Sequence, residues 1–143
     1  MKIGIHTLWM DSDPNGGVST YLKTLIQNLG AIDTRNQYTV YYAHPKALAT
    51  ADYVPAHFRT RVLWPSSLWI EIPISLPLEL RRRPVDVLHV LAVAPPRCPV
   101  PFVQTLNDIT WETHPEVYPL MVRFRLSRVV RATARRAAKI ITV

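Results

Sequence analysis

The chain has 143 residues, which suits one domain and leaves little room for a second. Hydrophobic residues make up 48% of the sequence and charged residues 19%, and this balance excludes a broadly disordered chain. The formal net charge of +7 favours anionic partners such as phosphate groups, acidic lipid headgroups or nucleic acid, without choosing among them. The single cysteine, Cys98, excludes an internal disulfide and fits a reducing cytosol. Because no run of about 18 apolar residues occurs, we expect no membrane-spanning helix.

The first third of the chain predicts a strand, a turn and a helix. Lys2–Trp9 has strand character, and Asp11–Gly17 is a cluster of turn residues. Apolar residues then recur at helical spacing from Val18 to Leu29, and Gly30 stands where a glycine commonly ends a helix. Strand, glycine turn and helix form the opening half of a βαβ unit.

The remaining elements continue the alternation of strands and helices. Further strands are predicted over Tyr38–Ala43, Phe58–Leu63 (at an edge), Val85–Leu91 and Pro101–Leu106. Leu68–Arg83 is ambiguous, because its apolar content suits a helix that its two prolines would break or kink. A polar loop over Asn107–Pro119 precedes a helix over Leu120–Ala138, and a last strand begins at Lys139. Because the sequence stops inside that strand, we expect the chain to be a truncated domain.

This alternation predicts an α/β fold, a Rossmann-like three-layer structure with a mostly parallel sheet. Right-handed crossovers place the carboxyl ends of all strands on one rim, where ligands of such sheets bind. The sequence predicts that this rim contains residues 6–17, 89–96 and 107–115.

Gly16 and Gly17 lie just before the first predicted helix. The free N–H groups at a helix start, with its partial positive charge, can bind a phosphate, and glycine lets a ligand approach the backbone. The alternative is a tight turn that uses glycine for geometry alone. A lone glycine pair does not separate the two interpretations.

Three other residues are candidates for a site at the rim. Asp108 can orient a sugar hydroxyl or stabilise positive charge on a sugar carbon, and Asn107 stands beside it. The alternative for this pair is an Asx turn or a helix cap. His89 can face the cleft or be a hydrogen-bonded histidine at the end of the sheet, and His6 can approach the same cleft. No histidine pair has metal-ligand spacing, so we expect no structural metal and no cofactor.

The last helix concentrates positive charge. Seven of the 17 basic residues are Arg123, Arg125, Arg128, Arg131, Arg135, Arg136 and Lys139. A basic amphipathic helix can rest on anionic lipid, and the alternative is the solvated outer face of a packed helix. Aromatic residues do not alternate with these arginines, so nucleic acid is not an expected partner.

Four segments in order resemble family 4 glycosyltransferases, the retaining group with the two-domain GT-B fold. "GGVSTYLKTLIQNL" is similar to their glycine loop and first helix, and "VDVLHV" to their fourth strand. "PFVQTLNDITWETHPEVYP" and "RFRLSRVVRATARRAAKIITV" are similar to their fifth strand with its loop and to the helix and strand that follow. The resemblance covers nearly the whole chain.

The resemblance implies that residues 1–143 are the incomplete N-terminal, acceptor-side domain of a GT-B enzyme, whose donor-binding C-terminal domain is absent. It implies transfer of a sugar, with retention, from a nucleotide-sugar donor to a sugar or lipid-linked acceptor, and a fragment inactive by itself. Gly16 and Gly17 would reach the donor phosphate across the cleft, and His89 would lie near the substrates. The family usually has His-Asp after the fifth strand, whereas this chain has Asn107-Asp108, and an asparagine cannot become a cation.

Two alternatives remain open at this point. One is a GT-B nucleotide-sugar epimerase, for which the sequence carries no clear acid/base set. The other is a non-catalytic basic module that docks on an anionic membrane or polyanion. We expect a cytoplasmic protein, with peripheral contact to the inner face of the membrane as an open alternative.

Overall fold

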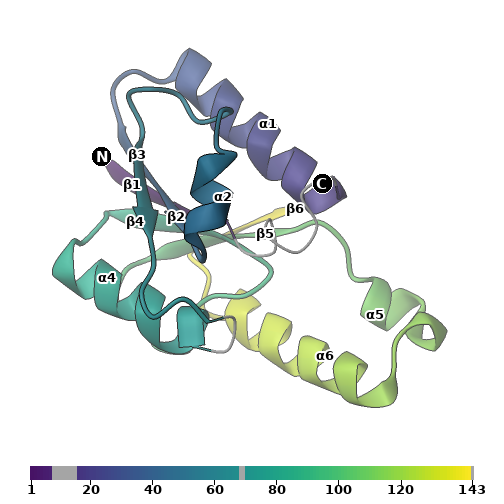
Figure 1. Ribbon diagram of the computed structural model, residues 1–143. Helices are drawn as coiled ribbons and strands as arrows, with labels where there is room; N and C mark the ends of the chain where they lie inside the picture. The colour runs from purple at the N-terminus through teal and green to yellow at the C-terminus, as the bar shows by residue number, and fades with distance from the viewer. Residues whose placement is uncertain (8–15, 68–69, 143) are drawn as a thin grey trace.

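The centre of the protein is a six-stranded sheet in which every pair of neighbouring strands runs parallel (Figure 1). The computed structural model describes residues 1–7, 16–67 and 70–142. The strands are β1 (Lys2–His6), β2 (Gln37–Tyr42), β3 (Arg59–Val62), β4 (Val87–Leu91), β5 (Phe102–Leu106) and β6 (Lys139–Thr142). Their order is β3-β2-β1-β4-β5-β6, so the chain reverses direction across the sheet between β1 and β4. The predicted parallel α/β sheet is confirmed, with β3 at an edge as expected.

Helices lie on both faces of the sheet and make three layers. One face carries α1 (Gly17–Ile32) and α2 (Pro45–Ala49), and the other carries the π-helix η1 (Glu71–Ser75), α4 (Leu76–Arg82) and α6 (Leu120–Ala134). The predicted polar loop contains two short helices, α5 (Thr110–Thr113) and the 3-10 turn η2 (Pro115–Val117). Figure 1 shows α5 and the beginning of α6 projecting away from the sheet.

Each face of the sheet has its own apolar core. On the α1 face, Ile5 and Val40 pack with Leu22 and Ile26 of α1. On the α4 face, the core joins apolar side chains of β2, β4 and β5 to Leu76 and Leu80 of α4. A parallel sheet covered on both faces needs apolar residues on both sides, which explains why its strands are continuous hydrophobic runs in the sequence.

Helix ends and prolines account for the differences from the sequence-based boundaries. Gly30 does not end α1, which continues to Ile32 and is capped by the backbone of Asp33. A glycine is required there because a side chain at position 30 would overlap the ring of Pro55. In the ambiguous segment, Pro73 lies within the π-helix, and Pro77 occupies the first turn of α4, where a missing N–H costs nothing.

The beginning of α6 is less buried than its sequence pattern predicts. Val130 and Thr133 are buried as expected, but Val122 and Val129 are exposed. The helix ends at Ala134, four residues before the predicted end, and α5 is the element that packs most closely against it. Of the predicted first strand and turn, Leu8 to Asn15 lie outside the described residues.

Candidate functional site

The carboxyl ends of β1, β4 and β5 lie along one rim of the sheet, as the sequence predicts. The register places Ile5 of β1 beside His89 of β4, and Leu91 of β4 beside Thr105 of β5. The first turn of α1 reaches the same rim, because Val18 lines a pocket there together with Asn107 and Asp108. Segments far apart in the sequence therefore meet where ligands of doubly wound sheets bind.

The rim pocket has a volume of about 210 Å³. Its walls are mainly apolar, and its polar groups come from β5 and the loop behind it. It is lined by Val18, Leu91, Ala92, Thr105, Asn107, Asp108, Trp111, Tyr118, Leu126 and Val130. A concave apolar site with a few polar groups is typical of small-molecule binding.

The start of α1 leaves backbone donors facing the rim. Gly16 is the residue before the helix, with extended backbone angles, and its carbonyl accepts a hydrogen bond from Thr20 N at 2.9 Å. No side chain of the described residues caps the helix start, and its first turn contains no acidic residue. Within residues 1–7, 16–67 and 70–142, the free N–H groups and the partial positive charge of this helix start therefore have no side-chain cap.

The backbone at Gly17 does not require glycine. No described glycine has a positive φ, so the strain that a turn glycine would relieve is absent in this part of the chain. A Cβ at Gly17 would meet nothing within 4 Å. A side chain there would instead enter space beside the helix start that no described atom occupies, where an anion could approach the backbone.

Asp108 and Asn107 differ in whether their side-chain oxygens already accept hydrogen bonds from the protein. Asp108 Oδ1 accepts hydrogen bonds from Thr110 N at 3.0 Å and Thr110 Oγ1 at 2.7 Å, which is the Asx-turn arrangement left open by the sequence. Asp108 is nevertheless exposed. Asn107 Oδ1 is buried and has no hydrogen-bond partner among the described residues. A buried acceptor without a donor is costly, so a ligand hydroxyl or amide at this point would gain a prepared partner.

His89 is buried beneath the rim and does not line the pocket. It is 8% exposed, and its Nε2 lies 2.8 Å from Thr105 Oγ1, which in turn is 3.3 Å from Tyr21 OH. Burial, with a smaller contribution from His6, lowers the pKa of His89 from 6.5 to about 4. The ring is therefore neutral near pH 7. Of the two interpretations from sequence, the hydrogen-bonded histidine at the end of the sheet describes it.

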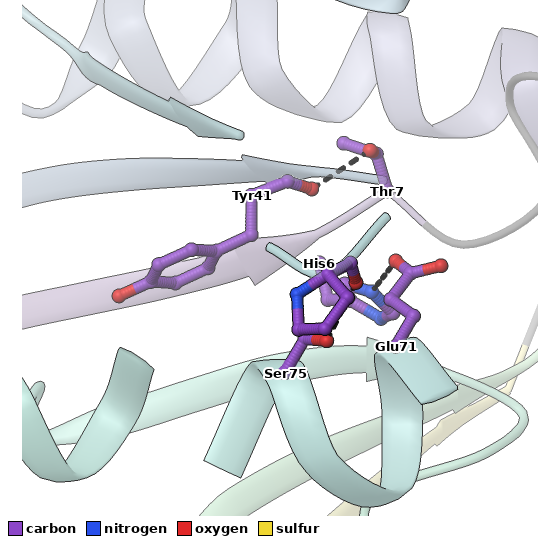
Figure 2. A network of polar contacts seen from close by, with 6 residues as sticks. His6, Thr7, Tyr41, Glu71 and Ser75 are labelled. Carbon is purple, nitrogen blue, oxygen red and sulfur yellow. Dashed lines mark hydrogen bonds and ion pairs between the residues drawn. The ribbon is translucent and has the colours of Figure 1, made fainter. Parts of the chain in front are cut away.

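A buried histidine–glutamate pair stands beside the point where the chain reverses across the sheet (Figure 2). His6 Nε2 lies 2.5 Å from Glu71 Oε1, and both side chains are almost fully buried. Figure 2 shows the two side chains meeting between the end of β1 and the π-helix η1, with Ser75 close by. His6 Nδ1 and Glu71 Oε2 have no hydrogen-bond partners among the described residues. No local sequence pattern indicates this pair, because 65 positions separate the two residues.

Beyond β4, the backbone of the rim is held in an unusual conformation. Ala92 has a φ of 50°, the only positive φ of a described non-glycine residue. Gln104 Nε2 donates a hydrogen bond to Ala92 O at 2.5 Å and ties this residue to β5. Strained backbone of this kind costs on the order of 1 kcal/mol or more, and proteins concentrate it at ligand sites. Ala92 lines the rim pocket.

Within the described residues, no three His, Cys, Asp or Glu side chains are placed to hold a metal ion. In the same part of the chain, no helix has the length and apolarity needed to cross a membrane. The sheet order, parallel strands and two helical layers define a doubly wound, Rossmann-like α/β fold with a candidate small-molecule site at its rim. Comparisons with protein-family models, curated proteins and solved structures found no match to this chain.

Proposed function

We propose that this chain is the N-terminal, acceptor-side domain of a retaining GT-B glycosyltransferase that moves a sugar from a nucleotide-sugar donor to an acceptor. The observation that carries the proposal is the rim pocket. There the start of α1, which has no side-chain cap from the described residues, lies near Asn107 Oδ1, an acceptor without a partner among the same residues. The sequence resemblance to family 4 glycosyltransferases, described above, supplies the reaction. A second domain would bring the donor to the other side of this rim.

The groups at the rim suit the charges that develop during sugar transfer. As the bond to the departing phosphate breaks, negative charge grows on that phosphate and positive charge on the sugar carbon. The amides at Gly16 and Gly17 would stabilise the first, because they are fixed donors at the positive end of α1. The exposed carboxylate of Asp108 would face the second, and Asn107 would accept a hydrogen bond from a sugar hydroxyl.

The test is turnover of the full-length enzyme carrying Gly17→Val, assayed with a panel of nucleotide sugars. The Cβ of a valine at this position would meet no described atom within 4 Å. We expect turnover to fall about a hundredfold, the usual loss when one fixed donor to a developing anion is removed. Asp108→Asn should also lower the rate.

The matched control is Ala31→Val, which places the same side chain on an exposed position in the last turn of α1. Both variants should melt close to the parent. Near-normal turnover of Gly17→Val, with every donor that the parent accepts, would mean that the glycines form only a turn.

As a second candidate, we propose that α6 docks the protein on an anionic membrane surface. At the beginning of this helix Met121 is 79% exposed and Phe124 is 57% exposed, and the neighbouring Leu120 is also exposed. The arginines at 125 and 128 share this outward side, with the Arg128 guanidinium 5.2 Å from the centre of the Phe124 ring. Exposed apolar side chains surrounded by arginines suit the interface between acyl chains and acidic headgroups.

Charge favours lipid over a second copy of this chain. α6 contains four arginines and no acidic residue, so two such faces would repel one another. Co-sedimentation with phosphatidylcholine vesicles, with and without phosphatidylglycerol, tests the proposal. We expect binding only to the anionic vesicles, reduced by salt and by Phe124→Ser. Ile32→Ser, at an exposed apolar residue in α1, is the control and should leave binding unchanged. Equal binding to neutral vesicles would contradict this role.

A further inference from the structure

Five cationic side chains surround a hollow on the α4 face of the sheet, at the end opposite the rim pocket. The hollow has a volume of about 310 Å³. Its cations are Lys2, Arg59, Arg61, Arg82 and Arg83, and Glu79 is the single acidic residue in its lining. They come from β1, β3, the last turn of α4 and the residue that follows it. Figure 1 shows the N-terminus and the end of α4 on this same side of the molecule.

Most of this positive charge is not neutralised by the protein. Glu79 Oε1 accepts a hydrogen bond from Arg83 Nη1 at 2.8 Å, which uses the one carboxylate of the lining. Among the described residues, no carboxylate forms an ion pair with the side chains of Arg59, Arg61 or Arg82. The nearby carboxylate of Asp86 accepts a hydrogen bond from the backbone N of Lys2 at 2.7 Å. Like charges gathered in a concave surface raise the local concentration of anions.

The backbone fixes the arginines of β3 on one face. Arg59 and Arg61 are two positions apart in a strand, so their side chains leave the same side of the sheet. Their register partners on β2 are Thr39 and Tyr41. The Tyr41 ring is buried in the core of the α4 face and also contributes to the lining. Burial, and then the charge of Glu79, raises the pKa of Tyr41 to about 12, so its hydroxyl remains neutral beside an anion.

Ordinary structural roles explain why each cationic residue is present, but not why all five line the same hollow. Charged residues on an edge strand such as β3 discourage pairing with another sheet. A basic residue such as Arg82 in the last turn of a helix offsets its partial negative charge. Neither role requires the two elements to direct their cations toward one hollow, together with Lys2 of β1.

We propose that this hollow binds a soluble anion that carries two or more linked phosphate groups. Several guanidinium groups can bind neighbouring phosphate groups, each through paired hydrogen bonds. An anion with only one such group, for example sulfate, would engage only some of these guanidinium groups. The site lies on different elements from the rim pocket, so it is independent of the proposed sugar transfer. An anion bound in this hollow would contact side chains of β3 and α4.

Isothermal titration calorimetry with inorganic tripolyphosphate tests this proposal. We expect one saturable site and much weaker binding of sulfate. The double variant Arg59→Gln/Arg61→Gln should bind tripolyphosphate at least about tenfold more weakly, since each charged hydrogen bond contributes strongly to affinity. Both residues are at least partly exposed on an edge strand, so the variant should fold, which its melting curve would show.

Two controls separate this site from general attraction and from the rim. Arg125→Gln/Arg128→Gln removes the same charge from α6 and should leave the affinity within about twofold, because exposed charges farther than a Debye length contribute little. Gly17→Val alters the rim and should have no effect. The proposal is overturned if the α6 variant weakens binding as much as the β3 variant, if Gly17→Val abolishes it, or if binding does not saturate.

Discussion

Among single residues, the two glycines of α1 differ in whether the fold needs them. A side chain at Gly30 would meet the ring of Pro55, whereas one at Gly17 would meet open space. We therefore expect Gly30→Ala to lower the free energy of unfolding by about 1–3 kcal/mol, as overpacking usually does. Gly17→Ala should leave it unchanged or raise it by up to about 1 kcal/mol, because alanine favours helix. Urea denaturation of both variants measures the difference, and equal midpoints would show that Pro55 moves aside.

His89 predicts a loss of stability in mild acid. Its pKa is about 4 in the folded protein, below the 6.5 of an exposed histidine, so the unfolded chain binds a proton first as the pH falls. The stabilisation is complete above pH 6.5 and is lost progressively toward pH 4. From this shift we expect a loss of about 2 kcal/mol by pH 5. Denaturation of the parent and His89→Asn across this range measures it, and parallel pH profiles of the two proteins would contradict the assignment.

At the scale of elements, the buried pair of His6 and Glu71 connects β1 to the π-helix. Removing one partner leaves the other buried without this hydrogen bond, so His6→Leu and Glu71→Met should each cost about 1–3 kcal/mol. Since each partner also has one atom without a hydrogen-bond partner among the described residues, replacing both should be less costly than either single change. A double-mutant cycle of unfolding free energies measures the coupling. Additive costs would mean that the two side chains stabilise the fold independently.

The same pair shows where sequence reasoning stops. The strands, their parallel arrangement and the meeting of Asn107 and Asp108 with the start of α1 followed from local patterns and the rules of α/β topology. The partner of His6 depends on how a proline-containing segment bends into a π-turn, and no periodicity encodes that bend. His89 shows the same limit, because the sequence left open whether it faces the cleft or forms a hydrogen bond at the end of the sheet, and its burial and contact with Thr105 show the second.

The exposed beginning of α6 has a similar explanation. The apolar stripe predicted a buried inner face from Val122 onward. Such a stripe shows only that one side of the helix is apolar, and not how much of that side is buried. Only the second half of the helix reaches the sheet, where Val130 and Thr133 are buried. Beside the helix lies α5, whose Glu112 forms an ion pair with Arg131 of the second half at 2.8 Å. The apolar stripe of a helix can therefore be longer than the part of the helix that packs against the sheet.

At the scale of the whole molecule, the sheet order predicts which amides exchange most slowly. β1 lies between β2 and β4, and both central strands are mostly buried. β3 and β6 are edge strands, and every residue of β6 is exposed. Hydrogen exchange should therefore be slowest in β1 and β4 and fastest in β6. Faster exchange in β4 than in β6 would show that the sheet opens at its centre.

The position of β1 in the sheet also affects how the chain folds while it is being synthesised. One neighbour of β1 is β2, but its other neighbour is β4, where Ile3 pairs with Val87. A nascent chain can join the first three strands early, yet one side of β1 stays unpaired until more than half of the sequence has been synthesised. Such distant pairing slows folding, and an unpaired apolar strand attracts other chains. The strand that ends among the most protected is thus the one that waits longest for its second neighbour.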